Sequence, residues 1–157
     1  MKFLLPVAPG LGPLIDPLIV AHAPGVDLLR LEGRSHEALA ACDLTLIASG
    51  TATLEAALFK RPMVIGYRMH PLSWQLMKRM AYQPWVGLPN ILAREFLVPE
   101  RIQSACTPER LAADVLAGLD DATRADRLRA RFTAMHLELR RDTATAATQA
   151  IAEVLHA

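Results

Sequence analysis

The sequence predicts an α/β fold in which a parallel sheet is covered by helices on both faces. Short apolar runs alternate with segments of helical periodicity, as βαβ units require. The clearest junction leads from the apolar run Leu44–Ala48 through Ser49-Gly50-Thr51 into a helical pattern. The chain has 157 residues, of which 52% are apolar and 21% charged, and this suits a globular domain with a buried core. We therefore expect residues 1–157 to form a single domain.

Four apolar runs are the predicted strands of this sheet. They are Lys2–Val7, Asp27–Leu31, Leu44–Ala48 and Met63–Gly66. Between them the pattern predicts a short helix ending near Ala23, a helix capped by Ser35 that runs through Ala41, and the helix Thr51–Phe59. Strands separated by helices in this way pair in parallel, and the ligands of such sheets bind beyond the carboxyl ends of the strands.

The first residues have a second interpretation, as a secretory signal. Met1-Lys2 and an apolar stretch precede Ala21-His22-Ala23, which has the form of a signal-cleavage site. Prolines and glycines interrupt that stretch, namely Pro6, Pro9, Gly10, Gly12, Pro13 and Pro17. Because they fit a strand and a turn better than a continuous apolar helix, we favour the strand. No window approaches the ~18–20 consecutive apolar residues of a membrane span.

The segment from Pro71 to about Met80 is predicted to be a helix, with Leu72, Leu76 and Met80 on one side and Lys78-Arg79 on the other. Three aromatic residues lie in or near it: Trp74, Tyr82 and Trp85. Basic residues beside aromatic ones are typical of helices that bind membrane surfaces, so a membrane surface is one candidate partner. The alternative, which the shortness of the pattern favours, is a helix whose apolar side packs on the sheet with two aromatic side chains in the core.

A helical C-terminal segment is predicted for about residues 107–157. Its start is marked by Thr107-Pro108-Glu109, in which a capping threonine precedes a proline and an acid. Three helices are expected, one to about Leu119, one from Ala122 to about Arg140 and one over Thr143–Leu155. The apolar stripe of the second consists of Leu128, Phe132, Met135 and Leu139. The charged residues fit a solvated face, so this segment is expected to cover the core rather than carry chemistry.

The junction after Ala48 is the strongest candidate for a ligand site. Small residues between a strand and a helix leave backbone N–H groups free at the positive end of the helix dipole, which favours phosphate. Glu55 falls about one turn into the helix, where its carboxylate is expected to accept hydrogen bonds from ribose hydroxyls. The alternative is an ordinary turn, with Thr51 as the helix cap and Glu55 on a solvated face.

The composition argues against several other functions. The formal net charge of +1 gives no reason to expect nucleic acid as a partner. Cys42 and Cys106 lie far apart in the sequence, which fits a reducing compartment and argues against a disulfide framework. The five histidines show no i, i+3 or i, i+4 spacing, and we expect neither a metal site nor a cofactor.

Three motifs, in this order along the chain, resemble those of the lipid-A-disaccharide synthases. They are Ala48-Ser49-Gly50-Thr51-Ala52-Thr53-Leu54-Glu55-Ala56, Lys60-Arg61-Pro62-Met63-Val64-Ile65-Gly66-Tyr67-Arg68-Met69 and Leu88-Pro89-Asn90-Ile91-Leu92-Ala93. That family consists of glycosyltransferases with two Rossmann-like domains and the GT-B fold, and the resemblance extends from about Leu39 to the end of the chain. It implies that residues 1–157 are an incomplete C-terminal domain, Rossmann-like, that binds a nucleotide sugar.

The resemblance also implies an activity. Members of the family transfer 2,3-diacylglucosamine from UDP to lipid X, which forms the lipid A disaccharide of lipopolysaccharide and releases UDP. The residues that match the site for the donor, UDP-2,3-diacylglucosamine, are Ser49, Gly50, Thr51, Glu55, Arg68 and Asn90. The resemblance implies that Ser49, Gly50 and Thr51 bind the diphosphate and that Glu55 binds the ribose. It places Arg68 and Asn90 near the donor. It further implies a cytoplasmic location, with peripheral attachment to the inner membrane as an alternative.

The sequence departs from the family in its length. Nothing in it corresponds to the N-terminal domain, which in GT-B enzymes supplies most of the acceptor site and the general base, and the chain opens on what resembles the second strand of the C-terminal domain. The catalytic residues are therefore expected in a missing N-terminal half, and the expected protein partners are that half or further copies of this chain. The alternatives are a UDP-binding remnant without activity or another GT-B enzyme that uses a UDP-sugar, which Gly66-Tyr67-Arg68-Met69 and Leu88-Pro89-Asn90 argue against.

Overall fold

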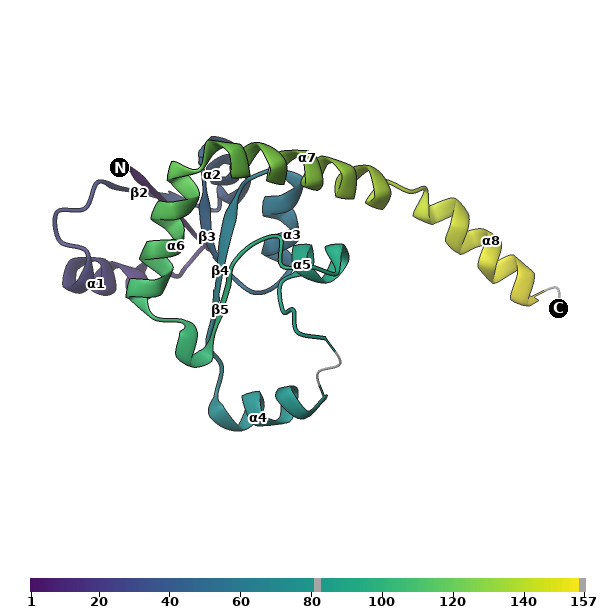
Figure 1. The fold of residues 1–157 in the computed structure, drawn as a ribbon, viewed down its shortest axis with the longest axis horizontal. Coiled ribbons are helices and arrows are strands. Elements are labelled where there is room, and N and C mark those ends of the chain that lie inside the picture. The colour runs from purple at the N-terminus through teal and green to yellow at the C-terminus, as the bar shows by residue number, and fades with distance from the viewer. Residues whose placement is uncertain (81–82, 156–157) are drawn as a thin grey trace.

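The computed structural model describes residues 1–80 and 83–155, which form five strands and eight α-helices (Figure 1). The strands are β1 (Phe3–Val7), β2 (Leu28–Glu32), β3 (Thr45–Ala48), β4 (Met63–Tyr67) and β5 (Glu100–Ile102). The α-helices are α1 (Gly12–His22), α2 (Ser35–Ala41), α3 (Thr51–Leu58), α4 (Pro71–Met80), α5 (Leu88–Ala93), α6 (Pro108–Asp120), α7 (Ala122–Leu139) and α8 (Thr143–Leu155). A short 3-10 turn, η1 (Gln103–Ala105), follows β5. The four predicted strands and the predicted helices are all confirmed, whereas α5 and β5 are additional.

The strands are all parallel, as the sequence predicts, but they form two sheets. β1 pairs with β2, with Phe3 opposite Leu28, and the other sheet has the order β3–β4–β5. In that sheet Ile47 lies opposite Ile65, which in turn lies opposite Glu100. The predicted α/β class with parallel strands is confirmed, but the four predicted strands are divided between two sheets, because within the described ranges no backbone ladder joins β1 to β3.

The three-stranded sheet is the centre of a layered arrangement (Figure 1). α3 packs on one face and α6 on the other, both against β3 and β4. α7 crosses the end at which the strands begin and contacts α3, α5 and α6. The core between these elements consists of Leu39, Ala56, Ala57, Met63, Ile65, Val98, Leu128 and Phe132. Helices therefore cover both faces of this sheet, as the α/β prediction requires.

An ion pair attaches α6 to the edge strand of this sheet. Arg101 in β5 donates hydrogen bonds from Nε (2.5 Å) and Nη2 (2.7 Å) to the carboxylate of Asp114 in α6. The hydrogen bond to Asp114 raises the pKa of Arg101 above its ordinary value. The two hydrogen bonds of this ion pair fix the orientation of α6 on the sheet.

The N-terminal unit, made of β1, α1 and β2, packs less tightly than the rest. Within residues 1–32, all of which the structure describes, only Val7 is buried. α1 has no buried residue. β1 nevertheless pairs with β2 along its whole length, so the interpretation of the first residues as a strand is confirmed.

Helix ends differ from the prediction in two details. Ser35 is the first residue of α2 and does not cap it, because Arg34 holds the position before the helix. Leu139, at the end of α7, is 42% exposed and does not belong to the buried stripe. The other members of that stripe are buried: Leu128, Phe132 and Met135. Thr107 caps α6 as predicted, since its side chain accepts a hydrogen bond from the Arg110 N–H.

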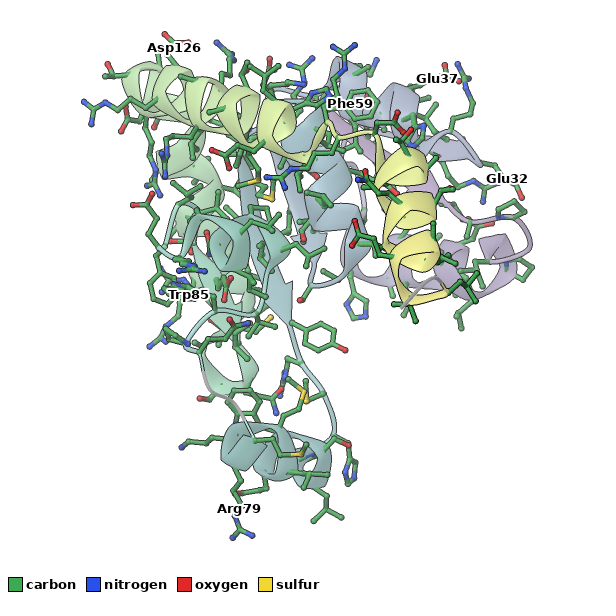
Figure 2. All side chains as sticks on the ribbon, turned by 90° about the vertical axis from the view of Figure 1, so that its right-hand side faces the viewer. Glu32, Glu37, Phe59, Arg79, Trp85 and Asp126 are labelled. Atoms are coloured by element: carbon green, nitrogen blue, oxygen red, sulfur yellow. The ribbon has the colours of Figure 1, made fainter. Side chains whose placement is uncertain are left out.

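α4 forms where the sequence predicts it, but its environment is different. Leu72, Leu76 and Met80 are 74%, 61% and 72% exposed, and no residue of α4 is buried. The helix stands away from the rest of the chain in both views (Figures 1 and 2). The expectation that its apolar side packs on the sheet is therefore wrong. The physical reason is that residues 68–70 continue outward from β4, so the helix does not return over a face of the sheet.

The two tryptophans near α4 are not core residues either. Trp74 and Trp85 are half-buried, and Tyr82 lies outside the described residues. Trp85 packs edge-on against Phe96, with ring centroids 6.2 Å apart. Among the helices that the structure describes, none combines the length and the apolar character needed to cross a membrane.

Candidate functional site

The turn between β3 and α3 lies at the carboxyl end of the three-stranded sheet. Gly50 adopts φ 149° and ψ −169°, a conformation that only glycine adopts readily. A Cβ atom there would meet nothing within 4 Å, so the backbone conformation rather than space requires a glycine. Gly50, and not Thr51, holds the position before the helix, and no side chain caps α3.

The start of α3 offers free hydrogen-bond donors. The first N–H groups of a helix have no partner within it. Among the described residues none accepts a hydrogen bond from the N–H of Thr51 or Ala52. These donors stand at the positive end of the helix dipole, so the turn can bind an anionic group.

Thr53 holds this turn in shape. Its side chain is fully buried, and its hydroxyl donates a hydrogen bond to the Gly50 carbonyl oxygen at 2.7 Å. The hydroxyl oxygen of Thr53 in turn accepts a hydrogen bond from the Leu88 N–H at 3.3 Å. The first bond closes the turn and the second attaches it to the start of α5. Sequence reasoning places Thr53 only in the helical pattern, because its partner Leu88 is distant along the chain.

Ser49 uses its hydroxyl in a similar way. Its Oγ donates to the Val86 carbonyl oxygen at 3.2 Å, and the residue is half-buried. This bond joins the end of β3 to the loop that precedes α5. The hydroxyl proton is therefore already donated, and Ser49 can meet a ligand through its remaining lone pairs or its backbone.

Glu55 lies one turn into α3, with its side chain 46% exposed. Its Oε2 is 3.6 Å from Nε2 of His36 in α2. The His36 ring packs against Phe59, with centroids 5.5 Å apart. A carboxylate this exposed has room to accept hydrogen bonds from the hydroxyls of a ligand. Sequence reasoning misses His36 because it stands in another helix and its spacing to Glu55 matches no motif.

Arg68 is exposed and lies just beyond β4, at the same edge of the sheet as the turn. The side-chain amide of Gln103 bonds both the backbone N–H and the carbonyl oxygen of the next residue, Met69. The Met69 N–H donates to Oε1 at 2.7 Å, and Nε2 donates to the Met69 carbonyl oxygen at 3.1 Å. Gln103 follows β5 directly, so this amide fixes the segment that carries Arg68. Because Gln103 lies beyond β5 and far along the chain, the motif around Arg68 gives no signal of it.

Asn90, in α5, lies beside the start of β5, and both polar atoms of its side chain have hydrogen-bond partners. It is 0% exposed, its Nδ2 donates to the Val98 carbonyl oxygen (2.9 Å) and to Glu100 Oε1 (2.8 Å), and its Oδ1 accepts the Val98 N–H (3.0 Å). Glu100 also accepts the N–H groups of Val86 and Gly87, at 3.0 and 2.8 Å. The Asn90–Glu100 pair therefore orders the loop over residues 86–88.

Gly87 lets this loop lie close against β4. A Cβ atom at Gly87 would stand 2.3 Å from Ile65 Cδ1 and 3.1 Å from Glu100 Oε1, so no larger residue fits without displacement. The glycine therefore allows the loop to lie close to β4, and its neighbours Val86 and Leu88 bond Ser49 and Thr53.

The structure brings Ser49, Gly50, Thr51, Glu55 and Arg68 to one edge of the sheet. Asn90 instead lies buried in α5, bonded to residues at the start of β5. The arrangement offers hydrogen-bond donors, one carboxylate and one guanidinium, which suits a phosphate joined to a sugar. In the part of the chain that the structure describes, no group of three or more His, Cys, Asp or Glu residues could hold a metal ion. Two cavities lie at the opposite edge, where the strands begin, next to α7.

Comparison with known proteins gives consistent results. The profile of the protein family described as lipid-A-disaccharide synthetase matches residues 2–154. The lipid-A-disaccharide synthase of Thiobacillus denitrificans is 53% identical over 159 residues, which cover 100% of this chain and 42% of that protein. The corresponding proteins of Albidiferax ferrireducens and Burkholderia vietnamiensis are 52% and 48% identical over 99% of this chain. The chain spans 40–42% of the length of these curated relatives.

Proposed function

The chain belongs to the lipid-A-disaccharide synthetase family, and on this premise we propose that it is the donor-binding part of a hexosyltransferase. The donor is UDP-2,3-diacylglucosamine, the acceptor is lipid X, and the product is the lipid A disaccharide of lipopolysaccharide. The observation that supports this most is the β3–α3 turn, with two free N–H donors one helical turn from an exposed carboxylate. That spacing fits the diphosphate and the ribose of one nucleotide.

The proposal gives each residue a distinct role. The N–H groups of Thr51 and Ala52 bind the diphosphate, and Gly50 lets it approach the backbone closely, while Ser49 lines the same side. Glu55 accepts hydrogen bonds from the ribose hydroxyls, and Arg68 places a positive charge beside the donor. Asn90 acts indirectly, because its hydrogen bonds hold the loop over residues 86–88.

The free donors also have a part in the chemistry. During transfer the bond between the anomeric carbon and the phosphate oxygen breaks, and negative charge develops on UDP. The N–H groups and the helix dipole, equivalent to about half an elementary charge, stabilise that charge. The acceptor hydroxyl forms the new bond and loses its proton to a base. We place that base outside residues 1–157, because the only carboxylate that we assign to the donor site, Glu55, binds the ribose.

Both substrates carry acyl chains, so we place the reaction at the cytoplasmic surface of the inner membrane. The partners that we propose are the rest of the transferase or further copies of this chain. Within residues 1–80 and 83–155, β1 pairs only with β2 and β3 only with β4, and such unpaired strand edges suit association with other chains. Sedimentation at low micromolar concentration should therefore show oligomers, whereas a monodisperse monomer with a cooperative melt would contradict the expectation.

Calorimetric titration with UDP tests the donor site. Glu55→Ala should weaken binding by about 1.5–3 kcal/mol, because it removes one or two charge-assisted hydrogen bonds. Glu37→Ala is the matched control, since Glu37 is an exposed acid on the neighbouring helix α2 that pairs with Arg34. Equal affinities of the wild type and Glu55→Ala would remove Glu55 from the site, and a wild type that does not bind UDP would overturn the proposal.

A transfer assay tests the division of roles. The purified chain, given UDP-2,3-diacylglucosamine and lipid X, should form no disaccharide, because positioning the acceptor contributes several kcal/mol to catalysis and no base is assigned within the chain. Turnover would show that the catalytic residues lie among residues 1–157.

A further inference from the structure

α4 presents an apolar stripe to solvent. Leu72, Leu76 and Met80 follow one another at four-residue spacing, so they lie on one side of the helix. They are 74%, 61% and 72% exposed, and Met77 beside them is 42% exposed. Large apolar side chains gathered in this way mark a surface that something else covers.

The charge around α4 identifies what covers it. No Asp or Glu occurs between Glu55 and Glu95, so all 16 acidic residues of the chain lie outside this segment. Lys78 and Arg79 occupy the last turn of α4. Figure 2 shows Arg79 pointing away from the body of the protein. In a chain whose net charge is only +1, this segment is locally cationic and complements an anionic surface.

A second helix, α8, also exposes apolar side chains but lacks the positive charge that makes α4 complementary to an anionic surface. In α8, Ile151, Val154 and Leu155 are 61%, 78% and 76% exposed. α8, however, contains Glu153 and follows Asp142, so it lacks the excess of positive charge. The two helices therefore share exposed apolar side chains and differ in charge, which makes α8 an internal control.

The position of α4 relates it to the nucleotide site. The helix begins three residues after Arg68, at the edge of the sheet where β3 and β4 end. A surface that meets α4 therefore lies beside the edge to which we assign the donor. A donor whose acyl chains stay in a membrane could reach Gly50 and Glu55 without leaving that membrane.

We propose that α4 is a membrane-contact helix that inserts Leu72, Leu76, Met77 and Met80 into the headgroup region of an anionic phospholipid bilayer. Lys78 and Arg79 flank the inserted stripe and bind lipid phosphates. The inference deepens the proposed function and rests on it, because it assumes that the substrates are lipids held in a membrane. The vesicle binding itself can be measured without substrate, since it depends on the apolar stripe and the two cations of α4.

Flotation of the full chain with vesicles tests the apolar stripe. The wild type should float with vesicles of phosphatidylethanolamine and phosphatidylglycerol. The triple variant L72S/L76S/M80S should bind about tenfold more weakly or worse, because it removes most of the inserted area. The matched control is I151S/V154S/L155S on α8, which should bind as the wild type does. Equal losses in the two triple variants would overturn the proposal.

The basic pair has its own test. K78Q/R79Q should lower binding to the anionic vesicles about tenfold. The matched control is R140Q/R141Q, which removes two adjacent cations between α7 and α8 and should not lower binding. The difference should disappear in high salt, which screens the attraction, and on vesicles of phosphatidylcholine alone. A K78Q/R79Q variant that binds anionic vesicles like the wild type would overturn the role of charge.

Two further measurements separate this proposal from its competitors. If the wild type does not float, and L72S/L76S/M80S abolishes self-association in sedimentation, then the stripe is an interface between copies and the proposal is overturned. UDP titration of the same variants should give wild-type affinity, because α4 is not part of the nucleotide site. A wild type that floats but does not bind UDP would count against the donor site alone, and a wild type that binds UDP but does not float would count against α4 alone.

Discussion

The β1–β2 sheet and the β3–β4 pair of the second sheet are built from apolar runs of similar length but differ in what covers them. Around β3–β4–β5, helices on both faces exclude water, and Met63, Val64 and Ile65 are 2%, 1% and 0% exposed. In the β1–β2 sheet, Phe3 and Leu29 remain 43% and 45% exposed. The candidate nucleotide site lies on the β3–β4–β5 sheet, where its supporting loops rest on a packed core. The difference teaches that an apolar strand becomes core only if the chain provides helices to cover it.

Core substitutions should show the largest difference between the two sheets. Phe132→Ala, at a fully buried position against the β3–β5 sheet, should lower the free energy of unfolding by about 3–5 kcal/mol. Phe3→Ala in β1 should cost less than about 1 kcal/mol, because its side chain is already partly in water. Urea denaturation measures both. Equal losses would mean that the β1–β2 sheet is as well packed as the other.

Asn90→Ala should have the next largest effect. The change leaves the N–H and carbonyl of Val98 without their partner and should cost about 1–3 kcal/mol of stability. Gln75→Ala, an exposed amide on α4, is the control and should change stability by less than about 0.5 kcal/mol. A variant that keeps its stability but loses UDP affinity would instead show that Asn90 contacts the ligand.

The smallest effect concerns Cys42, at the end of α2 between the two sheets. Burial raises the pKa of the Cys42 thiol, so less of it is thiolate at pH 8 than in an unfolded chain. In a Cys106→Ser background, the pH midpoint of its alkylation rate should lie above that of the urea-unfolded protein. Identical midpoints would show that α2 does not stay docked, and would extend the loosely packed region as far as Leu39.

Much of the fold follows from local pattern, and the exceptions have physical causes. The run Leu44–Ala48 and the small residues after it predict β3, the turn and α3, because each signal is contained in neighbouring residues. β5 escapes prediction because Glu100-Arg101-Ile102 is short and mostly charged, and becomes a strand by pairing with β4. The spacing of Leu72, Leu76 and Met80 predicts that α4 has an apolar face, but it does not say what that face packs against.

The candidate site divides in the same way. Gly50 and Glu55 are predicted to face a ligand from their place in the turn, and the structure puts both at the carboxyl edge of the sheet. Their supports are invisible in the sequence, since Gln103 holds Met69 from 34 residues away and Glu100 holds Gly87 from 13. Contacts of this kind depend on which strands are neighbours, and residue spacing alone does not encode that.

Amide chemical-shift mapping with UDP tests the central claim most directly, since it compares the two sheets in one experiment. The largest shifts on titration of the labelled chain should fall on residues 50–53, whose N–H groups start α3, with smaller ones around Glu55 and Arg68. The amides of β1 and β2 should remain unchanged. Shifts concentrated on the β1–β2 sheet or at α7, with none at the β3–α3 turn, would contradict the account.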